Sequence, residues 1–224
     1  MKYNKIIDPI VKGLLKFLDK DSGYTLNIHQ DIRSENLAFQ HISFDVEDNF
    51  KFPNNSMWIT GRNLIDYDPK VIELILNPEL QYIDVGAGIG EFIPRLVRTF
   101  DSRLIHKPII IEPADYELML DMLDYSKRFL NERALSDRVN ELIDRINIIL
   151  NSNKVTLINK SLENAVKEQE LLGIADVIID NAGASHYAND FKYIWDLEKK
   201  LLKPNGILLS EVVKSSGVYY PNSS

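Results

Sequence analysis

The sequence contains no cysteine among its 224 residues. Disulfide bonds, thiolate metal ligands and cysteine nucleophiles are therefore excluded. No apolar run approaches the roughly 20 residues that a membrane-spanning helix needs, and the start of the chain lacks the hydrophobic region of a signal peptide. From these absences we expect a cytoplasmic protein that has no membrane partner.

Positive charge is also scarce, with 26 basic against 33 acidic residues and a net charge of −7. Binding to a nucleic-acid backbone needs concentrated positive charge, so this balance argues against nucleic acid as the main partner. Apolar residues make up 45% of the chain, enough for one sizeable core rather than two full domains. His29, His41 and His106 have no carboxylate or histidine at ligand spacing, so we assign no metal site.

A glycine-rich turn is the most informative stretch. Residues 82–85 are a short apolar run typical of a buried parallel strand, and a helical pattern begins at Glu91. The turn between them, Asp84-Val-Gly-Ala-Gly-Ile-Gly90, differs from the dinucleotide fingerprint G-x-G-x-x-G, whose last glycine is here Glu91. A carboxylate just before such a turn suits an ammonium or sulfonium ion better than a pyrophosphate.

This turn resembles the cofactor loop of class I S-adenosylmethionine-dependent methyltransferases. The resemblance implies an α/β fold with a doubly wound, mostly parallel, Rossmann-like sheet, and S-adenosyl-L-methionine as cofactor. It assigns cofactor contacts to Asp84, Gly86, Ala87, Gly88 and Gly90. The glycines would let the ligand approach backbone amides at the positive end of the following helix.

A second acid follows the next apolar run, residues 108–112. Glu112 lies about twenty positions beyond the glycine turn, where an acid can accept hydrogen bonds from both ribose hydroxyls. The segment Ile111-Glu-Pro-Ala114 is also similar to the corresponding methyltransferase segment, so Glu112 and Pro113 join the expected cofactor contacts. The alternative is a strand that simply ends in a charged residue.

The third apolar run, residues 155–158, leads to Ser161 and Leu162. Methyltransferases commonly have an aspartate here that accepts from the adenine amino group, and the next backbone N–H meets the ring. By that resemblance Ser161 and Leu162 contact adenine. A neutral hydroxyl would form a weaker hydrogen bond than a carboxylate would.

The fourth run, residues 176–180, opens into Asn-Ala-Gly-Ala-Ser-His-Tyr187. Short-chain dehydrogenases carry an Asn-Ala-Gly triplet, but they also need a Tyr-x-x-x-Lys pair, which this sequence lacks. Small-molecule methyltransferases carry an asparagine, a histidine and an aromatic residue in this loop. That resemblance assigns Asp180 and Asn181 to the cofactor, Tyr187 to the substrate and His186 to catalysis as a base. His186 could equally orient the loop without titrating.

The remaining patterns divide the chain into an N-terminal arm and a main domain. We expect an amphipathic helix over 6–18, a strand over 42–46, a helix beginning at Asp68-Pro69, two helices within 115–150 with Ser136 capping the second, a helix over 191–202, a turn over 203–206 and a strand over 207–213. Only eleven residues follow Val213, so the sheet is expected to lack the usual C-terminal antiparallel hairpin. The expected parts are an arm over 1–63, a methyltransferase domain over 64–213 and a tail over 214–224.

Two residues of the arm, Trp58 and Arg62, lie close in sequence to the glycine turn and are candidate substrate contacts. A buried core tryptophan and a solvated arginine are the alternatives. Methyl transfer to a small-molecule acceptor is the function that the resemblance favours. Transfer to protein or nucleic acid, or a non-catalytic cofactor-binding or interaction module, remains open, and so does homo-oligomerisation.

Overall fold

The computed structural model describes residues 24–30, 42–48, 56–58, 76–129, 133–181, 183–188, 190–212 and 215–219. The chain divides into two compact units. Unit 1 comprises residues 1–61 and 114–150, and unit 2 comprises residues 62–113 and 151–224. Residues 114–150, which connect two stretches of unit 2, therefore belong to the same unit as the N-terminal part of the chain.

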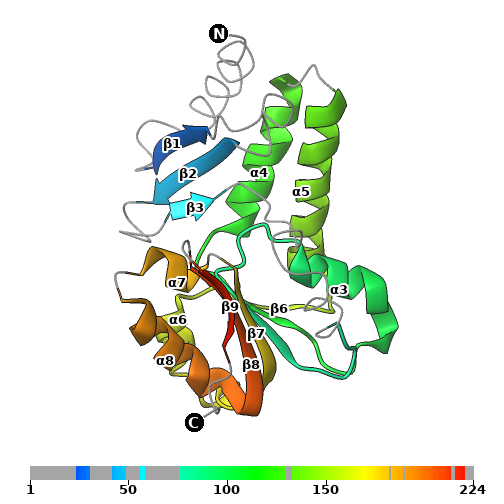
Figure 1. Ribbon diagram of the computed structural model, residues 1–224. Helices are drawn as coiled ribbons and strands as arrows, with labels where there is room; N and C mark the ends of the chain where they lie inside the picture. The colour runs from blue at the N-terminus through cyan, green and yellow to red at the C-terminus, as the bar shows by residue number, and fades with distance from the viewer. Residues whose placement is uncertain are drawn as a thin grey trace. The chain divides into compact units, whose positions relative to one another are not determined.

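Unit 2 is built on a six-stranded sheet with the order β6-β5-β4-β7-β8-β9 (Figure 1). Its strands are β4 (Tyr82–Val85), β5 (Ile109–Ile111), β6 (Thr156–Ile158), β7 (Ala175–Asn181), β8 (Leu202–Val212) and β9 (Ser215–Tyr219). The first five pair in parallel, and β9 pairs antiparallel with β8. The α/β class with a mostly parallel, Rossmann-like sheet is thus confirmed.

Helices cover both faces of this sheet. They are α3 (Phe92–Phe100), α6 (Leu162–Ala165), α7 (Ala184–Tyr187) and α8 (Phe191–Leu201), with short 3-10 turns η2 (Asp101–Arg103) and η4 (Gln169–Leu171). The Phe92 ring of α3 meets the buried Tyr82 ring edge-on, with 5.5 Å between centroids. The Asp190 side chain caps α8 by accepting a hydrogen bond from the Tyr193 amide, as expected for an aspartate before a helix.

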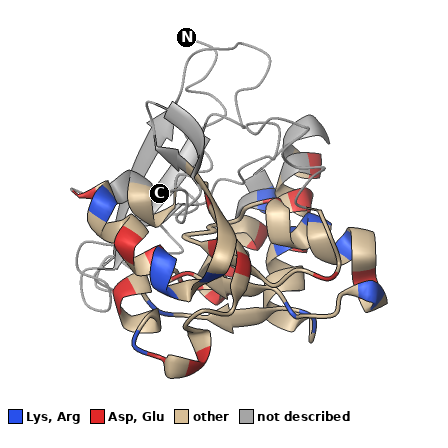
Figure 2. Cartoon of the chain, turned by 60° about the horizontal axis from the view of Figure 1, so that its bottom comes forward, with Lys and Arg blue, Asp and Glu red and all other residues tan. Residues whose placement is uncertain are grey.

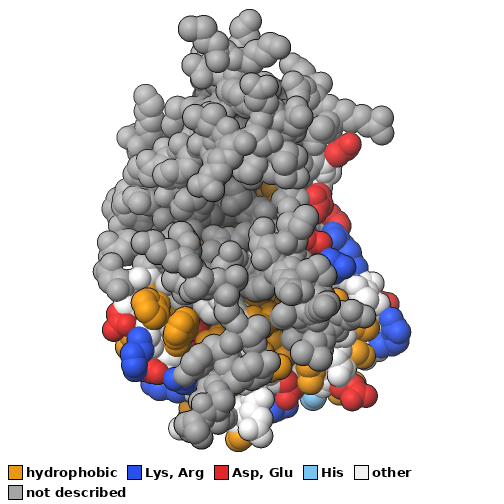
Figure 3. Space-filling model, in the orientation of Figure 1, with side chains coloured by type: hydrophobic (Ala, Val, Ile, Leu, Met, Phe, Trp, Pro, Cys, Tyr) orange, Lys and Arg blue, Asp and Glu red, His pale blue; other side chains and the backbone are white. Residues whose placement is uncertain are grey.

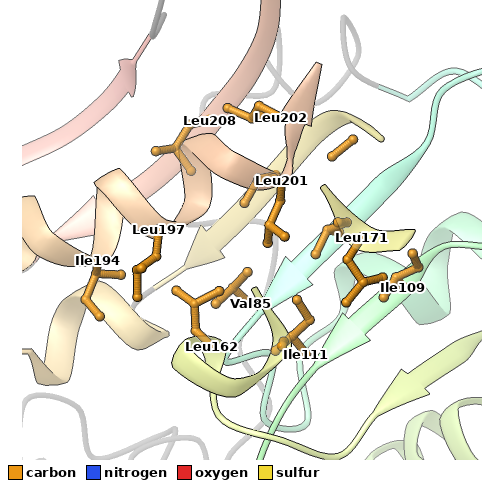
Figure 4. Close-up of a cluster of buried hydrophobic side chains, with 14 residues drawn as sticks. Val85, Ile109, Ile111, Leu162, Leu171, Ile194, Leu197, Leu201, Leu202 and Leu208 are labelled. Carbon is orange, nitrogen blue, oxygen red and sulfur yellow. The ribbon is translucent and has the colours of Figure 1, made fainter. Parts of the chain in front are cut away.

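One face of the sheet carries a buried apolar cluster shared with α6 and α8 (Figure 4). Val85, Ile109 and Ile111 contribute from the strands, and Ile194, Leu197 and Leu201 contribute from α8. The α8 residues recur at helical spacing, which places them on one side of the helix. Because side chains alternate along a strand, the residues next to Val85 and Ile111 face the other side of the sheet.

The expected turn over 203–206 lies inside the segment assigned to β8. Leu202 pairs with Ala175 and Ile207 with Val177, so the partner strand advances only two positions while β8 advances five. Asn205 has a positive φ of 66°. The four residues bulge out of the ladder and provide the turn within the strand.

The edge of the sheet differs from the expectation that no antiparallel strand follows Val213. After Val212 the chain reverses, and Val212 pairs with Ser215 and Leu208 with Tyr219. One antiparallel strand therefore lies beside β8, although the usual arrangement has two. Its polar and aromatic sequence, Ser-Ser-Gly-Val-Tyr219, lacks the continuous apolar run by which the buried strands are recognised.

Unit 1 contains a three-stranded antiparallel sheet of β1 (Tyr24–Gln30), β2 (Ile42–Asp48) and β3 (Ser56–Trp58). The helices α4 (Tyr116–Ser126) and α5 (Arg133–Asn151), with η3 (Lys127–Phe129) between them, belong to the same unit. The strand predicted over 42–46 is confirmed. The cap predicted at Ser136 is wrong, because α5 begins three residues earlier. The helices expected over 6–18 and after Pro69 lie outside the described residues.

The described surface carries both signs of charge. Figure 2, in which the ribbon is coloured by residue type, shows acidic and basic residues interspersed along the described helices. Hydrophobic side chains also reach this surface (Figure 3), and the large ones that are exposed include Ile105, Phe191 and Tyr193. Among the described helices, none is both long and apolar enough to cross a bilayer.

Candidate functional site

The turn after β4 adopts the backbone conformation that its glycines allow. Gly86 and Gly88 have φ values of 63° and 50°, a region that favours glycine. The Gly86 amide donates to the Ile111 carbonyl at 2.9 Å, and the Gly88 amide donates to Glu112 Oε2 at 2.9 Å. The second acid identified in the sequence thus contacts the glycine turn directly, across 24 positions of chain.

Asp84 and Glu112 lie on the same face of the sheet. In the register of β4 and β5, Asp84 is opposite Ile110 and Val85 is opposite Ile111. Val85 and Ile111 face the apolar cluster of α6 and α8, so Asp84 and Glu112 face the other side. Both carboxylates are nearly buried, with 5% and 7% of their surfaces exposed. Two acids therefore gather at the carboxyl ends of adjacent strands.

The carboxyl end of β6 lies at the same edge of the sheet as those of β4 and β5. The Glu112 amide donates to the Ile158 carbonyl at 3.1 Å, and the Asn159 side-chain amide donates to the Glu112 carbonyl at 2.9 Å. Asn159 thereby fixes the backbone of Glu112, a role that the sequence analysis missed. Ser161 precedes α6 as its N-cap residue, and its hydroxyl makes no capping hydrogen bond to the helix. The Leu162 side chain is buried in the apolar cluster, so only its backbone could face a ligand.

The turn after β4 and the loop after β7 touch backbone to backbone. A methyl group added at Gly86 would lie 2.6 Å from the Gly183 Cα, and one added at Gly183 would lie 2.1 Å from the Val85 carbonyl oxygen. Between β4 and β7 the strand order reverses direction, and ligands of such sheets bind outside the carboxyl ends of the strands at this point. Both glycines are needed for the two loops to meet there.

The Asp180 side chain makes hydrogen bonds within the protein, and its assignment to the cofactor stays a prediction. Asp180 is fully buried. Its Oδ1 accepts from the Gly183 amide at 2.8 Å and its Oδ2 accepts from the Ser185 amide at 2.9 Å. Asp180 has the same strand parity as Ile178, which faces the apolar cluster, so its side chain is on the opposite face from Asp84.

A second buried acid, Glu198 of α8, lies beside Asp180. Burial and the neighbouring negative charge of Asp180 raise the pKa of Glu198 well above its ordinary value. Burial also raises the pKa of Asp180, while the hydrogen bonds from Ser185 and Glu198 act in the opposite direction. The sequence contains a signal for Glu198: it lies four positions after Ile194, within the apolar stripe of α8.

Serine and tryptophan side chains extend this polar cluster. The Ser185 hydroxyl lies 3.1 Å from that of Ser210 on β8, and the Trp195 indole N–H donates to Ser210 Oγ at 3.2 Å. Ser185 and Ser210 are both buried. Ser210 of β8 therefore contacts both the segment after β7, through Ser185, and α8, through Trp195.

The other predicted site residues are placed only in part. Asn181 ends β7, and Pro113 follows Glu112 at the edge of the sheet. His186 and Tyr187 are in α7, directly after the Asp180-bound segment, but their side chains lie outside the described residues. Trp58 is in β3 of unit 1, paired with Asp45. Arg62 lies outside the described residues.

Across the described ranges, no group of three or more His, Asp or Glu side chains is arranged to hold a metal ion.

Comparison with known proteins gives a structural neighbour. Neither a protein-family model nor a curated protein matches this sequence. One solved structure to which this chain is similar is described as the trans-methyltransferase CalH in complex with SAH. The two are 19% identical, with a TM-score of 0.39, and the match covers 62% of this chain and 34% of that one.

Proposed function

We propose that unit 2 binds S-adenosyl-L-methionine and transfers its methyl group to a small-molecule acceptor, as class I methyltransferases do. The observation that carries the proposal is the contact between the Gly88 amide and Glu112 Oε2, 2.9 Å long, at the carboxyl ends of β4 and β5. This contact joins the glycine turn to Glu112, the acid proposed to bind ribose. Asp84 lies on the same face of the parallel sheet, and both acids are close to the point where the strand order reverses.

The residues present fit the parts of this cofactor. Glu112 can accept hydrogen bonds from two ribose hydroxyls, because a carboxylate has two oxygens with about four lone-pair sites, and the Gly88 amide donates to Oε2. Asp84 supplies negative charge for the ammonium or sulfonium group. The turn at Gly86 and Gly88 presents bare backbone to the ligand. Ser161 and Leu162 follow β6, and their backbone would lie beside the adenine.

S-adenosylmethionine would supply a methyl group already activated on a positively charged sulfur. The protein's task is then to align the acceptor in line with that carbon and to exclude water, and effective molarities from such alignment can reach about 10⁵ M. Asn181 would hold the methionine part by its backbone. His186 would receive the proton that a hydroxyl acceptor loses, since its ordinary pKa of about 6.5 suits a base. Tyr187, Trp58 and Arg62 remain proposed acceptor contacts.

Calorimetric titration with S-adenosylhomocysteine and, separately, with NAD tests the proposal. We expect the first ligand to bind and the second to give no heat of binding. Glu112→Gln should weaken S-adenosylhomocysteine about 10- to 100-fold, because hydrogen bonds to a charged acceptor contribute about 1.5–3 kcal/mol. Glu170→Gln is the matched control, since Glu170 is an exposed acid in η4, before the amino end of β7. Binding of NAD alone, or equal affinities in the two variants, would refute the assignment.

Methylation of protein or nucleic acid and a non-catalytic binding role are the competing functions. Incubating the protein with S-adenosylmethionine and separate pools of small metabolites, peptides and RNA, and then measuring S-adenosylhomocysteine release, distinguishes them. We expect release with the small-molecule pool. Binding without release from any pool would favour the non-catalytic role.

A further inference from the structure

The loop after β7 depends on one buried carboxylate. Asp180 accepts the amide hydrogens of Gly183 and Ser185, so its two oxygens fix the backbone of the segment that leads into α7. Two amide donors on one carboxylate favour its ionised form. Because Asp180 is fully buried, this negative charge has no access to water and needs further support from within the protein.

Glu198 lies where that support would come from. It is also fully buried, and its carboxyl group lies close enough to that of Asp180 for the negative charge of Asp180 to raise the pKa of Glu198. Neither Glu198 oxygen receives a hydrogen bond from an N–H or O–H donor in the described part of the chain. Two ionised carboxylates in contact would repel each other, and each lacks hydrogens to donate. A hydrogen bond between them therefore requires one proton.

Among the residues that the structure describes, no cation contributes to the pKa of either Asp180 or Glu198. The charge that acts on Glu198 is that of Asp180 itself. The basic side chains Lys192 and Lys199 of α8 both pair with Asp196 at the surface of the helix, 2.8 and 3.3 Å away. From β8 the neighbouring polar group is the hydroxyl of Ser210, which contacts Ser185 and Trp195.

We propose that Glu198 is a positioning residue that stays protonated at neutral pH and donates a hydrogen bond to Asp180. The shared proton holds Asp180 ionised and in place, and Asp180 in turn holds the Gly183 and Ser185 amides. A helix residue outside the ligand site thereby sets the backbone that presents Asn181 and His186. Its effect on cofactor binding rests on the proposed function, whereas its effect on the loop does not.

Two substitutions of similar volume separate hydrogen bonding from packing. Glu198→Gln keeps an N–H donor toward Asp180, and Glu198→Leu keeps the bulk but removes the donor. Asp196→Asn, at the exposed face of the same helix, is the control for altered charge. Each variant is first checked for folding by circular dichroism and thermal unfolding.

The first measurement is the infrared spectrum of the wild-type protein at neutral pH. We expect the carbonyl stretch of a buried protonated carboxyl group, absent from Glu198→Gln and retained in Asp196→Asn. A wild-type spectrum without that band, or a band unchanged in Glu198→Gln, would overturn the shared proton.

The second measurement is hydrogen exchange of the Gly183 and Ser185 amides by NMR. Glu198→Leu should lower their protection about tenfold or more, while Glu198→Gln should preserve it. Equal protection in both variants would show that Glu198 only fills space. If S-adenosylhomocysteine does not bind the wild-type protein, the proposed function is wrong. The two measurements above still decide whether Glu198 supports the loop after β7.

Discussion

The contact between Gly86 and Gly183 gives the sharpest quantitative prediction. In Gly86→Ala the new methyl group would lie 2.6 Å from the Gly183 Cα and 2.8 Å from the Ala184 nitrogen. These are backbone atoms, so the clash is relieved only by moving a loop. The residue must also adopt a φ of 63°, which costs a side chain about 1–2 kcal/mol. Overpacking adds about 1–3 kcal/mol more.

Gly173→Ala is the matched control. Gly173 has nearly the same φ, 66°, but the nearest atom to an added methyl group is the Leu202 carbonyl oxygen at 4.0 Å. Gly173→Ala should therefore lose stability from the positive φ but not from a clash with neighbouring backbone. Urea unfolding of both variants measures the difference, and Gly86→Ala should also bind S-adenosylhomocysteine more weakly. Equal losses of stability in the two variants would refute the close approach of the two loops.

Three further predictions concern polar groups and their hydrogen bonds. Tyr82→Phe removes the hydroxyl that donates to the Asn77 carbonyl and accepts from its amide, each at 2.8 Å, and should cost about 1–2 kcal/mol in urea unfolding. Burial raises the pKa of Tyr82 from 10.0 to about 12. The stability that the neutral hydroxyl contributes to the wild type is therefore fully present below pH 10 and is lost as the pH rises to about 12. If Tyr82→Phe lost as much stability as the wild type over this pH range, the prediction would be contradicted. For Glu198, the raised pKa means that stability is present below the unfolded value of 4.5 and falls as pH rises above it. Glu198→Gln should therefore gain stability relative to wild type as the pH rises above 4.5, and parallel pH profiles would argue otherwise. Asn159→Ala removes a hydrogen bond to the Glu112 carbonyl and should weaken S-adenosylhomocysteine several-fold in calorimetry, whereas unchanged affinity would show that Glu112 is held without it.

The buried parallel strands could be predicted because they are continuous apolar runs. Ile109–Ile111 and the core of β7 have this pattern, and each ends in an acid followed by a turn. The pairing of Glu112 with the glycine turn follows from the same reasoning, since parallel strands bring their carboxyl ends to one edge. Local pattern was sufficient for these features.

The face of the sheet on which Asp180 lies follows from strand alternation, which a family resemblance does not supply. Its two-residue spacing from Ile178 places both side chains on the same face, and the neighbouring α8 then buries it. The contact of Gly86 with Gly183 joins residues 97 positions apart and has no local signal. Likewise, β9 pairs only because β8 offers an edge, not because its own sequence is strongly strand-forming.

A crystal structure of the S-adenosylhomocysteine complex would show directly whether the two acids hold the cofactor. We expect adenosine across the carboxyl ends of β4 and β5, with the Glu112 carboxylate within hydrogen-bonding distance of both ribose hydroxyls and Asp84 near the amino group. Ligand bound elsewhere, while Glu112 contacts no ribose hydroxyl, would contradict it.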